Sequence, residues 1–121
     1  MRAVLVDVKN CDVREIECNN LDDYYNAIDC NTIDIVSRRI GDGWYDIIVD
    51  DEGLLADNPI PSALDVEHMT VMLVGNLIIS KHDGAGNEIS LDDDNVDEVM
   101  HNIVAVFDGK SIKPMLMCKY N

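Results

Sequence analysis

The chain has 121 residues and a formal net charge of −15, because 24 acidic residues face only 9 Lys and Arg. The length predicts one domain over residues 1–121, and an apolar content of 47% argues against a disordered acidic tail. So acidic a surface repels phosphates, which excludes direct nucleic-acid binding. No apolar run approaches the ~20 residues of a membrane span, and we expect no membrane partner. The N-terminus lacks a secretory signal pattern, so we expect a cytoplasmic protein.

The first fifty residues predict two hairpins with a helix between them. Residues 2–8 form an apolar strand, and residues 13–18 form its hairpin partner after an Asn- and Asp-containing turn. Apolar residues at spacing i, i+3, i+4 and i+7 predict an amphipathic helix over residues 21–29. Two β-branched or aromatic runs, 33–40 and 44–50, flank a Gly-Asp-Gly turn and form the second hairpin.

The middle of the chain predicts an irregular segment followed by a strand. Residues 54–67 contain two prolines that interrupt ladders and helices, so only one helical turn is expected, at residues 62–64. The β-branched run at 71–79 predicts a single interior strand, bulged near Gly75 and Asn76.

The last third predicts a helix and a strand. Apolar residues follow the helical period from Val96 to Phe107, so a long helix is expected from Ser90 onward, stopped at Gly109. Its inner face should bury Val99, Ile103 and Val104 almost completely. Residues 111–120 form a final strand, which should lie at an edge or pair on one side at its proline, residue 114.

This order of elements predicts an α+β fold. The strands should form a mostly antiparallel sheet built from hairpins, with two helices packed on one face.

The same order, with its motifs, resembles a known family. The start RAVLVDV, then VREIE and LDDYYNAID, is followed by YDIIVDDEGLLADNPIPSAL and VGNLIISKHDGAGNEISLDDDNVDEVM. This arrangement resembles the small phage- and plasmid-borne proteins of domain of unknown function family 3846. The resemblance runs from Met1 to about Phe107 and implies a bacterial, phage or mobile-element origin. It implies no activity. The positions that match the family pattern are Asp50, Asp51, Gly53, Asn58, Pro59, Gly75, Ser90 and Leu91.

Two clusters of carboxylates are the candidate site residues. The first, Asp50 to Glu52, follows a hairpin strand, and the second, Asp92 to Asp94, opens the last helix. Either cluster could bind a hard cation through oxygen ligands. The alternatives are a solvated turn for the first cluster and helix capping for the second. The EF-hand pattern is not met, so no metal is assigned.

The spacing of the four cysteines gives no indication of a bound cofactor. No pair has the C-x-x-C spacing of zinc or redox sites, and a reducing compartment would keep the thiols free. We therefore expect no disulfide and no zinc.

The charge distribution is the most specific signal. Sixteen of the 24 acids lie between Arg39 and Lys110, a stretch whose only cation is Lys81. Solubility, a salt-loving host or a basic partner surface each account for it. Most of these acids should be exposed, because burying unpaired charges is costly.

The sequence thus leads to a non-enzymatic accessory protein of a phage or mobile element. It would contact a basic protein surface, in the sharpest form as a mimic of nucleic-acid phosphates that occupies a DNA-binding protein. The alternative is a cation-binding module or metal-dependent enzyme that uses the same carboxylates. An exposed Trp44 would join the contact, although packing on the sheet is an alternative role. The expected contact residues are Asp50, Asp51, Glu52, Asp92, Asp93, Asp94 and Trp44.

Overall fold

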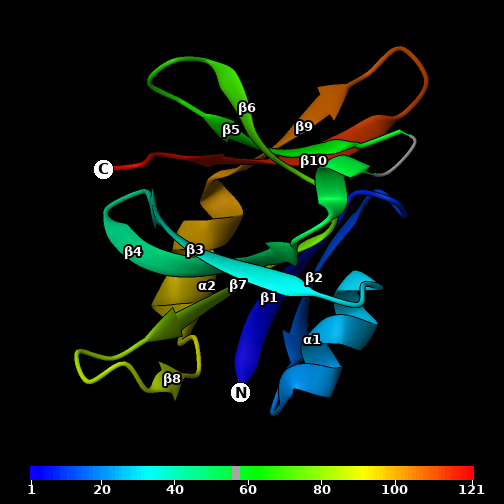
Figure 1. Ribbon diagram of the computed structural model, residues 1–121. Helices are drawn as coiled ribbons and strands as arrows, with labels where there is room; N and C mark the ends of the chain where they lie inside the picture. The colour runs from blue at the N-terminus through cyan, green and yellow to red at the C-terminus, as the bar shows by residue number, and fades with distance from the viewer. Residues whose placement is uncertain (56–57) are drawn as a thin grey trace.

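A computed structural model describes residues 1–55 and 58–121 (Figure 1). The strands form two sheets, and we call the larger one sheet A. Its strand order is β2-β1-β7-β4-β3, with β8 paired to β7. Strand β1 has both faces buried, which explains its continuous apolar sequence. All pairings in the sheet are antiparallel. The strands are β1 (Arg2–Asp7), β2 (Asp12–Glu17), β3 (Ile33–Ile40), β4 (Gly43–Asp50), β7 (Leu77–His82) and β8 (Glu88–Ile89).

A second sheet, sheet B, lies over one face of sheet A (Figure 1). Its strand order is β6-β5-β10-β9, and β10 runs parallel to β5 but antiparallel to β9. The two sheets share one apolar core, in which Leu116 and Cys118 of sheet B meet Ile47 and Leu77 of sheet A. The strands are β5 (Pro61–Asp65), β6 (Thr70–Val74), β9 (Ile103–Phe107) and β10 (Ile112–Cys118).

Helix α1 (Leu21–Ile28) covers the face of sheet A away from sheet B. The Asn20 side chain caps it by accepting a hydrogen bond from the Asp23 amide at 3.0 Å, as Asn does at helix starts. Its buried residues, Tyr24 and Ile28, pack in a second apolar cluster with Leu5 and Ile78 of sheet A. Figure 1 shows α1 below sheet A, opposite sheet B.

Helix α2 (Asp93–His101) packs on the other face of sheet A. Its buried residues, Val96 and Val99, belong to the core shared by the two sheets. The α+β class and the mostly antiparallel pairing are confirmed. The expectation that both helices share one face is wrong, because α1 and α2 lie on opposite faces of sheet A.

The long helix expected from Ser90 to Phe107 is also wrong in its second half. Helix α2 ends at His101, and β9 follows at once. Val99 is fully buried as expected, but Ile103 is only half-buried and Val104 is 42% exposed. Because every residue of β9 is apolar, its sequence fits the period of a helix and that of a strand equally well. Its β-branched residues favour the strand.

The interior strand expected at residues 71–79 is two strands in two sheets. Gly75 takes a φ of +79°, a left-handed conformation that suits glycine, and carries the chain from β6 of sheet B to β7 of sheet A. The helical turn expected at residues 62–64 is wrong, since these residues lie in β5.

Three further expectations concern Pro114, the cysteines and membranes. Pro114 pairs with Ala105 of β9, and β5 pairs with β10 only from Leu116 onward, so the proline pairs on one side as expected. All four cysteines are described and carry free thiols, and burial raises the pKa of Cys18 and Cys118 to about 11. No helix of the described residues is long and apolar enough to cross a membrane.

Candidate partner-binding cleft

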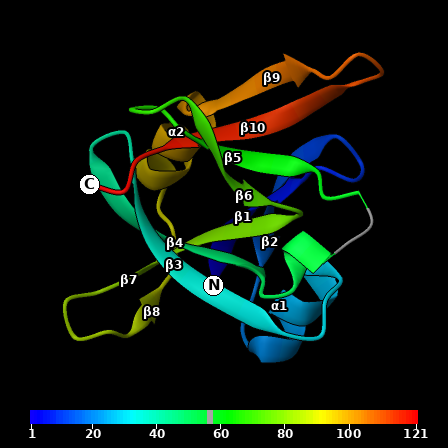
Figure 2. The ribbon, with the colours of Figure 1, turned by 45° about the horizontal axis from the view of Figure 1, so that its top comes forward.

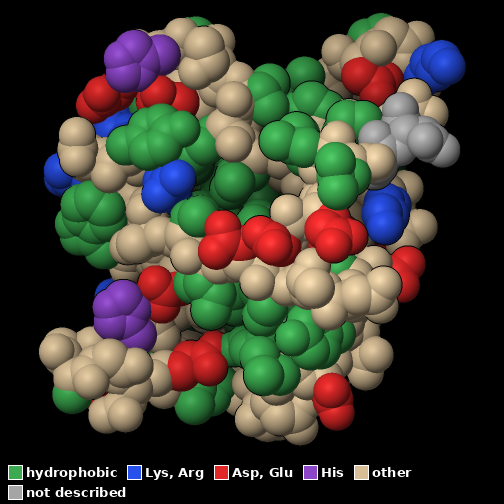
Figure 3. Space-filling view, in the orientation of Figure 1, with side chains coloured by type: hydrophobic (Ala, Val, Ile, Leu, Met, Phe, Trp, Pro, Cys, Tyr) green, Lys and Arg blue, Asp and Glu red, His purple; other side chains and the backbone are tan. Residues whose placement is uncertain are grey.

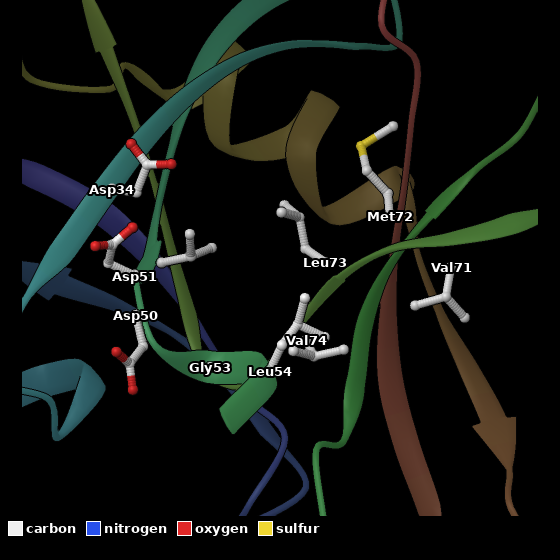
Figure 4. A pocket seen from close by; sticks show the side chains of 10 residues that line it. Asp34, Asp50, Asp51, Gly53, Leu54, Val71, Met72, Leu73 and Val74 are labelled. Carbon is white, nitrogen blue, oxygen red and sulfur yellow. The ribbon is translucent and has the colours of Figure 1, made fainter. Parts of the chain in front are cut away.

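An open cleft of about 310 Å³ separates the ends of the two sheets. One wall comes from β3, β4 and the turn that follows β4, and the other wall comes from β6 together with Leu54 of the short 3-10 helix η1 (Gly53–Leu55) (Figure 4). On the face shown in Figure 3, acidic side chains gather along one lip of a hollow and hydrophobic side chains along the other. The lining residues are Asp34, Val49, Asp50, Asp51, Gly53, Leu54, Val71, Met72, Leu73 and Val74.

The acidic wall forms where the β3–β4 hairpin ends. The Asp51 amide donates to the Thr32 carbonyl at 3.2 Å, and the Asp50 Oδ1 accepts from the Glu52 amide at 2.9 Å. These bonds close the turn after β4, and Asp favours such turns because its side chain bonds nearby amides. Figure 4 shows the carboxylates of Asp34 and Asp51 close together on this wall.

The apolar wall consists of side chains that a soluble protein usually buries. Leu54 is 78% exposed and Val71 is 53% exposed, while Met72, Leu73 and Val74 are half-buried. Figure 4 places the labelled β6 side chains across the cleft from Asp34 and Asp51. The cleft therefore offers an apolar contact surface beside a row of carboxylates.

The three cleft carboxylates have no ion-pair partner among the described residues. Among the described Lys and Arg side chains, only Arg2, Arg14 and Arg39 form ion pairs, and their carboxylate partners lie elsewhere. No Lys or Arg lines the cleft. The charge of Asp34, Asp50 and Asp51 is thus left for solvent or for a ligand. The carboxylates that do pair with Lys or Arg are Asp7, Asp12, Glu15, Asp42 and Asp93.

The second acidic cluster and Trp44 lie at the opposite end of sheet A, whereas Glu52 follows Asp51 beside the cleft. Strands β1 and β4 run in the same direction on either side of β7, so Arg2 and Trp44 mark one end and Asp50 the other. Asp93 lies at the Arg2 end, because its Oδ1 accepts from the Arg2 Nη1 at 2.7 Å. Trp44 is 50% exposed there. The structure therefore brings Asp50 and Asp51 into one cleft but leaves the second acidic cluster and Trp44 outside it.

The second cluster has a local structural role. The Asp92 side chain accepts from the Asn95 amide at 2.7 Å, and the Asn95 side chain accepts from the Asp92 amide at 3.0 Å. This reciprocal capping box satisfies two amides at the start of α2. Asp93 and Asp94 follow in the first turn, where the helix dipole favours negative charge.

Acidic side chains from Asp42 to Glu52 and from Asp92 to Glu98 are mostly exposed, as expected. None is fully buried, and only Asp46, Asp50 and Glu98 are half-buried. Glu98 accepts a 2.7 Å hydrogen bond from the Tyr45 hydroxyl, and Asp46 lies 2.7 Å from a ring nitrogen of His82.

A second cavity, of about 420 Å³, lies on the α1 face of sheet A. His82 and Asp46 line it with Glu88, a carboxyl whose pKa is raised by burial. Within residues 1–55 and 58–121, no group of three or more His, Cys, Asp or Glu side chains is arranged to hold a metal ion. The pair of His82 and Asp46 alone does not define a reaction.

Reasoning from sequence missed the cleft residues Asp34, Leu54 and Val71. Asp34 carried a signal, because it is an acid between Ile33 and Ile35 in a β-branched run. Its side chain must then point to the opposite side from those isoleucines. Val71 carried none, because its position depends on β6 belonging to the second sheet.

Comparison with known proteins gives the family and nothing further. The family described as Domain of unknown function (DUF3846) matches residues 1–103, which span sheet A, both α-helices and the cleft. No curated protein and no solved structure matches the chain. The match covers most of the 121 residues, so the chain belongs to the DUF3846 family.

Proposed function

We infer that the protein is a non-enzymatic accessory protein of a phage or mobile element. It acts in the bacterial cytoplasm by contact with a basic surface of another protein. The observation that supports this function is the cleft between β3, β4 and β6. There Asp34 and Asp51 are exposed and Asp50 is half-buried, none has a cationic partner among the described residues, and a partly exposed apolar wall lies beside them.

The cleft chemistry selects a basic segment that also carries apolar side chains. The net charge of −15 draws a cationic surface toward the protein over a distance set by the ionic strength. Lys or Arg head groups then bind the carboxylates of Asp34 and Asp51. Their aliphatic stems, or a neighbouring apolar side chain, cover Leu54 and Val71. Charge thus sets the rate and orientation of binding, and apolar burial holds the complex.

A DNA-binding protein is the sharpest form of this partner. Such a protein presents Lys and Arg for phosphates, and a carboxylate surface can occupy them. Asp92, Asp93, Asp94 and Trp44 would supply a second contact only for a partner that spans sheet A, since they lie at its other end. Glu52, exposed beside the cleft, extends the first contact.

The second candidate function is binding of a divalent cation by the same carboxylates. The feature that favours it is the pair of Asp34 and Asp51 on one wall of the cleft, although no three carboxylates of the described residues are arranged to hold an ion. Isothermal titration with Ca²⁺ and Mg²⁺ tests this function directly. Micromolar affinity that is lost in Asp51→Asn would favour it over the basic partner.

The leading function is tested with two peptides and two double variants. The first probe is a labelled peptide in which lysine alternates with valine, and its control peptide carries glutamate in place of lysine. The cleft variant is Asp34→Asn with Asp51→Asn. The matched variant, Asp22→Asn with Asp97→Asn, removes equal charge from two exposed side chains outside the cleft.

We expect the lysine peptide to bind the natural protein and the matched variant, and binding to weaken as NaCl rises. The cleft variant should bind at least about tenfold more weakly, which corresponds to the loss of about 1.4 kcal/mol. Equal losses in both double variants would show that net charge, not the cleft, attracts the peptide. Affinity that ignores salt would contradict electrostatic recruitment. Affinity capture from a bacterial lysate, at low and high salt, would then identify the natural partner.

A further inference from the structure

Strand β9 is an edge strand whose backbone is open to a partner. It is the last strand of sheet B, with β10 on one side and no described strand on the other (Figure 2). The Met117 amide donates to the Asn102 carbonyl at 2.7 Å, and the Asp108 amide donates to the Ser111 carbonyl at 3.1 Å. Because hydrogen bonding alternates along an antiparallel pair, the even-numbered residues of β9 bond to β10.

The amides and carbonyls of Ile103, Ala105 and Phe107 therefore point to the open edge. Pro114 agrees with this assignment. It lies in β10 opposite Ala105, and a residue without an amide hydrogen fits a position that does not bond to β9. The open edge thus presents a short ladder of donors and acceptors that the fold leaves unused.

The side chains of β9 are unusual for an exposed edge. All five are uncharged and apolar, although the chain carries 24 acids. Val104 is 42% exposed, Val106 is 39% exposed and Phe107 is 69% exposed. Soluble proteins usually protect such an edge with a charge, a proline or a covering segment, because a bare edge pairs with other strands.

We propose that β9 pairs antiparallel with β9 of a second copy of this chain, about a two-fold axis at Ala105. In this register Ala105 faces its own copy, Val104 faces Val106, and Ile103 faces Phe107. Every opposed pair is apolar, and the outward amides and carbonyls of the odd-numbered residues bond across the axis. The interface is isologous, as in most two-fold dimers, and extends sheet B across both copies.

The charges of β9 and β10 favour a second copy over other occupants. A basic partner finds no carboxylate on β9 or β10, and a nucleic acid finds only Lys113 on these two strands. A second copy brings a strand as uncharged as the first, so no acid meets another acid in the pairing. The proposal does not depend on the cleft, which lies at β6, the other edge of sheet B.

Analytical ultracentrifugation of the full chain tests this dimer. The natural protein should sediment at twice 13.5 kDa, and more completely at high salt, because salt screens repulsion between two acidic copies. Val106→Lys places a charge opposite Val104 of the other copy. Ala105→Pro removes an amide that only the second copy would use. Ile35→Lys is the matched control, because it changes a similarly exposed apolar residue on the edge strand of sheet A.

Each of the two β9 variants should raise the dimer dissociation constant by about tenfold or more, and the Ile35→Lys control should leave it unchanged. Circular dichroism shows which variants remain folded. One folded β9 variant is enough to test the dimer. A natural protein that stays monomeric at ~1 M NaCl, where the Debye length is about 3 Å, overturns the proposal. So does a dimer that folded β9 variants leave intact. Association that weakens with salt would assign the contact to the acidic cleft instead.

Discussion

Asp7 is the described carboxylate with the most hydrogen bonds in the interior. Its oxygens accept from the Asn10 amide at 3.1 Å, from the Asn10 side chain at 2.8 Å and from the Asn76 side chain at 3.0 Å. Burial by itself would raise the pKa of Asp7. The bonds from Asn10 and Asn76, with Arg14 at 3.6 Å, outweigh burial and lower it.

We therefore expect Asp7→Asn to destabilise the protein by about 1.5–3 kcal/mol near neutral pH, the range for a buried hydrogen-bonded charge. A lowered pKa means that the carboxylate stabilises the fold above its ordinary value of 3.8 and loses this effect as the pH falls through its folded value. Urea denaturation of both proteins at pH 7 and near pH 3 measures the difference. A difference that does not shrink in acid would contradict the assignment.

His68 should titrate above its ordinary pKa. Its Nδ1 lies 2.6 Å from the Oδ2 of the buried Asp65, and this hydrogen bond raises the pKa of His68 and lowers that of Asp65. The stabilising effect of the charged pair is complete below pH 6.5 and is lost as the pH rises through the raised value. Titration followed by NMR measures the His68 pKa, which should fall in Asp65→Asn. A His68 pKa that is unchanged in a folded Asp65→Asn variant would show that the pair does not form.

At the scale of elements, local signals predicted the first four strands and α1. The turn at Asn10 and Cys11, the Asn20 cap and the glycine turn before β4 act within a few residues, so the sequence alone specifies them. The later elements depend on contacts between sheets. Strand β9 continues the apolar period of α2, and its β-branched content and its pairing with β10 distinguish strand from helix.

Only the acidic wall of the cleft could be predicted from the sequence, because the apolar wall depends on contacts between the two sheets. Asp50 and Asp51 belong to a local turn, which the acid-rich sequence at a hairpin end already indicated. The apolar wall comes from β6, and its place opposite those acids depends on the left-handed turn at Gly75. A single glycine conformation thus decides which residues face the carboxylates.

The corrected position of β9 changes the expected cost of two core substitutions. Val99 is fully buried, so Val99→Ala should cost about 2 kcal/mol, from lost transfer free energy and a cavity. Ile103 is only half-buried, so Ile103→Ala should cost less than the 2–5 kcal/mol typical of a buried Ile. Chemical denaturation of both variants measures the order. A larger loss from Ile103→Ala than from Val99→Ala would place Ile103 in the core after all.

At the scale of the whole molecule, charge repulsion should dominate the response to salt. Among the Lys and Arg side chains, only Arg2, Arg14 and Arg39 form ion pairs, and they pair with only a few of the described carboxylates, so most of the −15 charge stays uncompensated. The Debye length falls from ~30 Å at 0.01 M to ~8 Å at 0.15 M, so added NaCl screens repulsion across the domain. The melting temperature should therefore rise with NaCl. A melting temperature that falls with salt would mean that the few ion pairs outweigh the repulsion.

The parallel pairing of β5 with β10 has a consequence for how the chain folds during synthesis. Strand β10 lies between β5 and β9, and it is the last of these strands to leave the ribosome. Until β10 is made, β5 and β6 can pair only with each other. The apolar residues of sheet A that pack with Leu116 in the finished protein remain uncovered. Pairing of β5 with β10 closes a loop of the chain from residue 66 to residue 111. Closing so long a loop is slow, because the chain loses conformational entropy before the contacts between the two strands form. The nascent chain therefore passes through a stage in which sheet B lacks its central strand and the core is uncovered. Arrival of β10 completes sheet B and covers the core.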